Sequence, residues 1–83
     1  MTQLELSQNN SSARNILRTY GESERLCREK ERRQITSLSR TQAWVLEREG
    51  QFPKRKKIGR TNVWLLSDLL LWAHQLKEGD ADE

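Results

Sequence analysis

The chain has 83 residues, of which 34% are hydrophobic and 33% are charged, so it can hold at most one domain with a small core. Its single cysteine, Cys27, excludes an intramolecular disulfide, and with the single histidine, His74, it cannot supply a four-ligand zinc site. The net charge is only +3, but residues 25–60 carry twelve Lys or Arg against four Glu, and this local charge of +8 predicts a polyanionic partner.

Residues 1–24 are predicted to form a flexible N-terminal arm. The run Ser-Gln-Asn-Asn-Ser-Ser at residues 7–12 is polar and favours disorder. A single helical turn is possible over Asn15 to Tyr20, and Gly21 would stop it. Because the arm offers few apolar side chains, its removal is expected to leave the fold intact. Residues 78–83 are predicted to be an acidic disordered tail.

Residues 25–77 are predicted to form the domain, mainly α with a small β-hairpin, as a winged helix-turn-helix. Residues 24–27 suit either a short strand or the start of a helix. Residues 29–35 contain no Gly or Pro and are rich in helix formers, although Ile35 is their only clearly apolar residue. A turn is expected at Thr36-Ser37-Leu38.

The next helix is predicted to run from Arg40 to Glu49. Ser39 is a favourable N-cap, because its hydroxyl can accept a hydrogen bond from an early backbone N–H of the helix. Gly50 suits the position just beyond the helix end, and Pro53 prevents the helix from resuming.

A β-hairpin is predicted over residues 54–66. Gly59-Arg60-Thr61-Asn62 should form its turn, with Gly59 and Asn62 able to adopt positive φ. Ser67 is predicted to cap the last helix, and Leu69, Trp72 and Leu76 should lie along one of its faces. Trp64 and Trp72 are expected in the core.

The helix at residues 40–49 is the predicted reader of DNA. Ala43 and Leu46 can pack inward, and this leaves the first turn and the opposite face free. Arg can pair with guanine and Gln with adenine in a bidentate fashion, and an exposed Trp or Val can touch a thymine methyl group. The candidate recognition residues are Ser39, Arg40, Thr41, Gln42, Trp44, Val45 and Arg48. A generic amphipathic helix with Trp44 in the core would show a similar pattern.

The hairpin is the predicted basic wing. Its residues can donate hydrogen bonds to phosphates or reach into a minor groove. The candidate wing and backbone contacts are Lys54, Lys56, Lys57, Arg60, Thr61 and Asn62. A solvated charged loop is the alternative interpretation of this cluster.

No catalytic set is evident, since the sequence shows neither a Gly-rich phosphate loop nor a histidine paired with a nucleophile. We therefore expect no enzymatic activity, no cofactor, no metal and no small-molecule substrate. The sequence also shows no signal peptide and no apolar run that could span a membrane, which predicts a cytoplasmic protein.

Several short motifs together resemble the AlpA family of prophage regulators. They are Leu38-Ser39-Arg40, Gly50-x-Phe52-Pro53, Lys57-Ile58-Gly59, and Val63-x-x-x-Ser67-Asp68-x-x-x-Trp72. The resemblance implies a MerR-like winged helix-turn-helix, related to excisionases, whose second helix and wing contact DNA. Two positions depart from the pattern: Arg32 or Arg33 stands where the family usually has an aliphatic residue, and Ser37 stands where it usually has Gly.

The sequence leaves the biological role open between three hypotheses. A transcriptional regulator and an excisionase both need a winged helix-turn-helix, and an excisionase also binds tandem sites and bends DNA. An integrase, or further copies of the chain, would then be additional partners beside double-stranded DNA. The third hypothesis is a small module that binds and modulates a host or phage protein.

Overall fold

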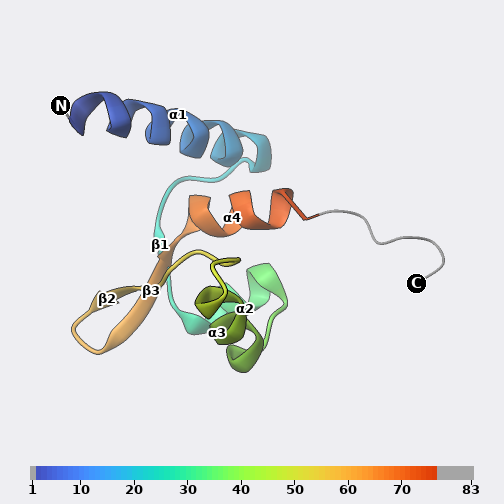
Figure 1. The fold of residues 1–83 in the computed structure, drawn as a ribbon. Helices are drawn as coiled ribbons and strands as arrows, with labels where there is room; N and C mark the ends of the chain where they lie inside the picture. The colour runs from blue at the N-terminus through green and yellow to red at the C-terminus, as the bar shows by residue number, and fades with distance from the viewer. Residues whose placement is uncertain (1, 77–83) are drawn as a thin grey trace.

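The computed structural model describes the backbone of residues 2–76 and the side chains of residues 11–76. Its elements in chain order are α1 (Thr2–Tyr20), β1 (Leu26–Cys27), α2 (Glu29–Thr36), α3 (Arg40–Arg48), β2 (Lys56–Ile58), β3 (Thr61–Leu65) and α4 (Leu66–His74). Helix α4 lies between α1 on one side and the α2–α3 pair on the other, and the β2–β3 hairpin projects away from the helices (Figure 1). The expected winged helix-turn-helix is confirmed; the predicted acidic tail at residues 78–83 lies outside the described residues.

The sheet has three antiparallel strands in the order β1-β3-β2. Residues 24–27 therefore supply a strand rather than the start of a helix, and Cys27 pairs with Trp64. The β2–β3 turn is shorter than predicted, because Ile58 pairs directly with Thr61. Gly59 takes a φ of 61° at the first of two turn positions, the arrangement of a type II′ hairpin. Asn62 lies inside β3, so its predicted positive φ is wrong.

Helix α4 begins one residue earlier than its predicted cap. Leu65 occupies the N-cap position and makes no side-chain capping hydrogen bond. Ser67 instead lies within the first turn, where its backbone N and its hydroxyl donate to the two carboxylate oxygens of Glu24, at 3.0 and 2.7 Å. Glu24 thus replaces Ser67 as the cap, since a carboxylate is favoured at the positive end of a helix.

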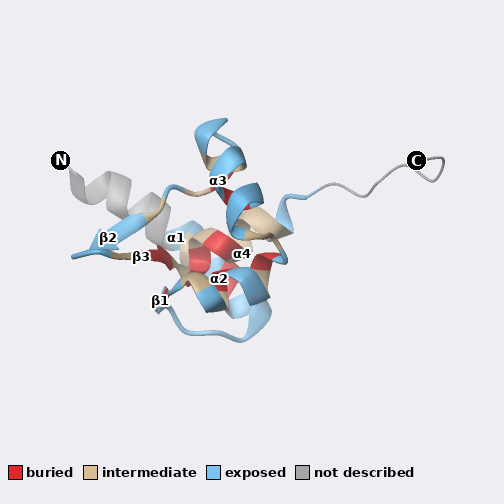
Figure 2. Ribbon diagram, turned by 90° about the horizontal axis from the view of Figure 1, so that it is seen from below, coloured by how far each residue is buried: buried red, intermediate tan, exposed pale blue. Residues whose placement is uncertain are grey.

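The core lies where α4 meets the inner faces of α1, α2, α3 and the sheet, and Figure 2 shows many of its buried positions there. Trp64 and Leu69 are almost fully buried, and Trp72 packs against the same cluster, as expected for both tryptophans. Leu76 was expected on the inward face of the last helix, but it lies beyond the end of α4 and is 59% exposed. Cys27 is fully buried, and this burial raises the pKa of its thiol to about 11.

The N-terminal segment differs most from its prediction. Residues 2–20 form one helix instead of a flexible arm, and Ile16 and Leu17 are buried against the core. Gly21 ends the helix with a φ of 67°, and the N–H of Glu22 donates to the Leu17 carbonyl at 2.8 Å. The tertiary contact explains the helix, because burying apolar side chains against α4 outweighs the weak helix propensity of the polar run.

Candidate nucleic-acid interface

Helix α3 is closed at its start by a reciprocal pair of hydrogen bonds. The Ser39 hydroxyl accepts from the backbone N of Gln42 at 3.1 Å, and the Gln42 side-chain oxygen accepts from the backbone N of Ser39 at 3.0 Å. This capping box confirms the predicted N-cap and holds the first turn in place. It also engages the amide oxygen of Gln42. A bidentate contact with adenine uses both amide atoms, so such a contact would compete with the cap.

The outward face of α3 carries most of the predicted recognition side chains. Trp44 and Val45 are 46% and 39% exposed, and the inward side of the helix is buried at Ala43. The guanidinium of Arg48 lies over the Trp44 ring, 4.6 Å from its centroid, so the two side chains form one flat, partly cationic surface. Trp44 is therefore a surface residue, and Arg40 and Thr41 are exposed in the first turn.

A buried charge links α2 to the turn that precedes α3. Arg32 is fully buried and pairs with Glu29, while one of its guanidinium nitrogens donates to the Thr36 hydroxyl at 3.1 Å and to the Leu38 carbonyl at 2.7 Å. Its guanidinium also lies over the Trp64 ring, 5.7 Å from the centroid. Arg32, one of the two arginines that depart from the resembled pattern, thus holds the turn in front of α3.

The turn itself contains the second departure from the family pattern. Ser37 has a φ of 62°, a left-handed conformation that disfavours residues with a Cβ atom. Its backbone N donates to the Arg33 carbonyl at 2.8 Å and closes α2. Glycine would adopt this left-handed conformation more readily, but here serine adopts it.

A connecting segment ties α3 to the wing. Gly50 ends α3 with a φ of 75°, and the N–H of Gln51 donates to the Leu46 carbonyl at 2.8 Å. Farther along, the Arg55 backbone N and Nε donate to the carboxylate of Glu47 at 3.3 and 3.0 Å. This half-buried pair fixes the base of the wing against the helix, so the two candidate DNA-binding elements form one surface.

The wing presents most of its predicted basic residues to solvent. Lys54, Lys56, Lys57 and Arg60 are exposed, whereas Thr61 and Asn62 are partly buried at the start of β3. Arg60 follows Gly59 at the tip of the hairpin that projects from the molecule (Figure 1). Four cationic side chains are thus available along one element, and this arrangement suits contact with a phosphate backbone.

Two hollows lie between α3 and the wing. The larger, of about 460 Å³, is lined by Trp44, Glu47, Arg48, Lys54, Arg55 and Lys57. The smaller, of about 200 Å³, is lined by Glu29, Arg40, Ala43, Arg55, Asn62 and Trp64. Residues predicted separately for helix and wing therefore meet at shared sites. Val45 does not join them, since it lines a separate depression with Arg48 and Glu49.

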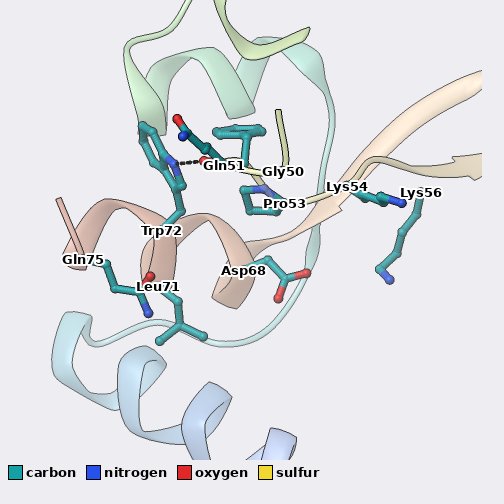
Figure 3. Close-up of a pocket in the computed structure, with 10 residues that line it drawn as sticks. Gly50, Gln51, Pro53, Lys54, Lys56, Asp68, Leu71, Trp72 and Gln75 are labelled. Atoms are coloured by element: carbon teal, nitrogen blue, oxygen red, sulfur yellow. Dashed lines mark hydrogen bonds between the residues drawn. The ribbon is translucent and has the colours of Figure 1, made fainter. Parts of the chain in front are cut away.

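A third hollow, of about 530 Å³, lies on another side of the connecting segment, between that segment and α4 (Figure 3). There the indole N–H of Trp72 donates to the Gln51 carbonyl at 2.9 Å, and the Trp72 ring packs edge-on against Phe52. Asp68 also lines this hollow; burial raises the pKa of its carboxyl, and the nearby Lys56 opposes that rise. None of the predicted recognition residues on α3 lies in it.

Sequence reasoning missed three contributors to the interface. Arg55 links helix and wing, Trp64 lines the smaller hollow, and Glu29 pairs with Arg32. Only Trp64 could have been found from the sequence. It lies two residues after Asn62 on the predicted strand, and residues two apart on a strand share a face. Among the described residues, no group of three or more His, Cys, Asp or Glu side chains could hold a metal ion. No helix within residues 2–76 is long and apolar enough to cross a membrane.

Comparison with known protein families gives a match over the part of the chain that contains the candidate interface. A family model described as the prophage CP4-57 regulatory protein (AlpA) matches residues 25–77, more than half of the chain. No curated protein and no solved structure matches significantly. The matched region begins just before β1 and contains α2, α3, the wing and α4.

Proposed function

Since the chain belongs to the AlpA family of prophage regulatory proteins, we propose that it is a sequence-specific DNA-binding regulator of a prophage or related mobile element. The observation that carries the proposal is the capped, outward-facing helix α3 joined by Glu47 and Arg55 to an exposed basic wing. Helix α3 would enter the major groove with its first turn towards the base edges. The wing would lie on the backbone and at the minor groove.

Arg40 is the residue we expect to read a base most directly. It is exposed in the first turn of α3 and has no ion-pair partner among residues 11–76, so its guanidinium is free for a guanine. Removing one bidentate contact should cost about 1–3 kcal/mol at one base position. The Arg40→Ala chain should therefore keep its stability and its weak binding to any duplex while losing preference for its site.

The experiment compares variants on a site selected from a random DNA pool and on a scrambled duplex, at one salt concentration. Gln42→Glu is included, because Glu preserves the capping box while replacing the amide donor with an acceptor. Arg33→Ala serves as the matched control, because Arg33 is an exposed arginine on α2 rather than α3. An unchanged ratio of the two affinities in both α3 variants would refute α3 as the reader.

The wing should supply affinity without sequence preference. Lys57→Ala and Arg60→Ala are expected to weaken binding to the selected and scrambled duplexes by the same factor, because phosphates carry no direct base information. With about four to six phosphate contacts, log affinity should fall against log salt with a slope of about −4 to −5. A slope near zero would contradict the assignment of the basic surface to DNA.

The same selection distinguishes the two biological roles. Clustered direct repeats would favour an excisionase acting with an integrase and with further copies of this chain, and a single site at a promoter would favour a transcriptional regulator. The third hollow, with Phe52, Leu71 and Trp72 in its walls, is where a protein-interaction module would receive its partner. A chain that retards no duplex at low salt would favour that alternative.

A further inference from the structure

Two buried polar atoms without a partner belong to residues that line the smaller hollow between α3 and the wing. They are the side-chain oxygen of Asn62 and the indole nitrogen of Trp64. Both residues belong to β3 and are two positions apart, so their side chains share one face of the strand. Trp64 is only 2% exposed. Both line the same hollow of about 200 Å³.

Such atoms indicate an occupant. An unpaired buried polar group is costly, and native proteins satisfy nearly all of them. The indole N–H can only donate, so whatever lies beside Trp64 must supply an acceptor. Asn62 can present either its oxygen or its NH₂ group to the hollow after a half-turn of its amide.

The charges around the hollow favour an anionic acceptor. Arg40 and Arg55 line it as cations, and Glu29 is its one acidic residue. The Glu29 carboxylate is already paired with Arg32, and Arg55 is paired with Glu47. Arg40 has no ion-pair partner among the side chains of residues 11–76, so the rim of the hollow keeps a net positive charge.

We propose that this hollow receives an oxygen of one DNA backbone phosphate, held by the Trp64 indole N–H and the Asn62 amide. The inference rests on the proposed function. If α3 occupies the major groove and the wing reaches the minor groove, one sugar–phosphate strand must pass between them, and this hollow lies there. The phosphate contact would fix the register from which Arg40 and its neighbours read bases.

The test follows the three indole N–H signals of the full chain by ¹H–¹⁵N NMR, assigned with single Trp→Phe variants. A 16-base-pair duplex is titrated at low salt, and inorganic phosphate is titrated separately at matched phosphate concentration. Saturating duplex should move the Trp64 signal downfield, because its N–H gains a charged acceptor. The Trp72 signal is the internal control, since its N–H is already bonded to the Gln51 carbonyl.

A matched pair of variants tests the same site through affinity. Asn62→Asp places a negative charge in the hollow and should weaken binding to any duplex at least about tenfold. Gln75→Glu makes the same amide-to-acid change at the exposed end of α4, and it should weaken binding less than about twofold. Thermal unfolding of both variants checks that they are folded at the assay temperature, and the NMR titration needs neither of them.

The outcomes separate this inference from the proposed function. Wild-type binding with an unmoved Trp64 signal would mean that the hollow holds ordered water only, and would overturn the inference while leaving DNA binding intact. An equal response to inorganic phosphate would identify a general anion site and would also overturn it. Failure of the wild-type chain to bind any duplex would refute the proposed function together with the phosphate site.

Discussion

Replacing the buried Arg32 should destabilise the helix-turn-helix more than any other single change on α2. Its guanidinium donates to Thr36 and to the Leu38 carbonyl, and hydrogen bonds from charged donors contribute about 1.5–3 kcal/mol each. The pair with Glu29 adds little, because that carboxylate side chain is 33% exposed and water screens it. We therefore expect Arg32→Ala to lower the free energy of unfolding by about 3–5 kcal/mol, including the effect of the cavity left beside Trp64.

The expected cost is a large part of the stability of so small a domain, and it should lower the melting temperature by at least about 12 °C. Thermal unfolding followed by far-UV circular dichroism measures the shift. Arg32→Leu should destabilise the fold less than Arg32→Ala because leucine refills much of the volume, although the Leu38 carbonyl stays unpaired. Arg32→Lys should fall between wild type and Arg32→Ala, since a single ammonium cannot make the forked set of contacts.

Arg33→Ala is the control for this series, because Arg33 is the next residue on the same helix and is exposed. Exposed substitutions of this kind usually change stability by less than about 0.5 kcal/mol. If Arg32→Ala and Arg33→Ala melt within about 3 °C of each other, the buried network does not hold the turn between α2 and α3.

Three further predictions concern the rest of the fold. Leu17→Ala should lower the free energy of unfolding by about 2–4 kcal/mol, whereas Arg18→Ala, at an exposed residue, should hardly change it. Equal melting temperatures of the two variants would show that α1 does not pack against α4. Ser37→Gly should raise stability by about 0.5–1 kcal/mol in urea unfolding, because glycine relieves the left-handed backbone; any loss would contradict the strain assigned there. With its pKa raised to about 11, Cys27 should be alkylated by iodoacetamide at pH 8 on the order of 100-fold more slowly in the native chain than in urea, and equal rates would argue against its burial.

The elements predicted well from sequence are those specified by neighbouring residues. Helix α3 lies within one residue of its expected bounds, because Ser39 supplies the cap and Gly50 the left-handed end. The hairpin is also predicted correctly, except that its turn contains only Gly59 and Arg60, because Thr61 and Asn62 already pair with β2. In both cases the determining interactions span only a few positions in the chain.

The predictions that the structure contradicts involve interacting residues that lie far apart in the chain. Glu24 caps α4 from 43 residues away, so the local pattern favoured Ser67 in its place. Helix α1 owes its position to contacts with α4, which no periodicity within residues 1–24 could reveal. For the candidate interface, the exposed side chains of α3 could be named in advance, but the hollow at Asn62 and Trp64 could not, because it depends on how the wing packs against α3.

The position of α1 bears on how this small domain remains folded. The family match covers residues 25–77, whereas Ile16 and Leu17 lie outside it and are buried in the same cluster as Trp64 and Leu69. Tyr20 adds a polar contact, with its hydroxyl 3.3 Å from His74 Nδ1 at the far end of α4. Since α4 also packs on α2 and on the sheet, α1 supports the element that holds the helix-turn-helix and the wing together. Loss of α1 should therefore weaken DNA binding indirectly, by loosening α4, without removing any residue of the proposed interface.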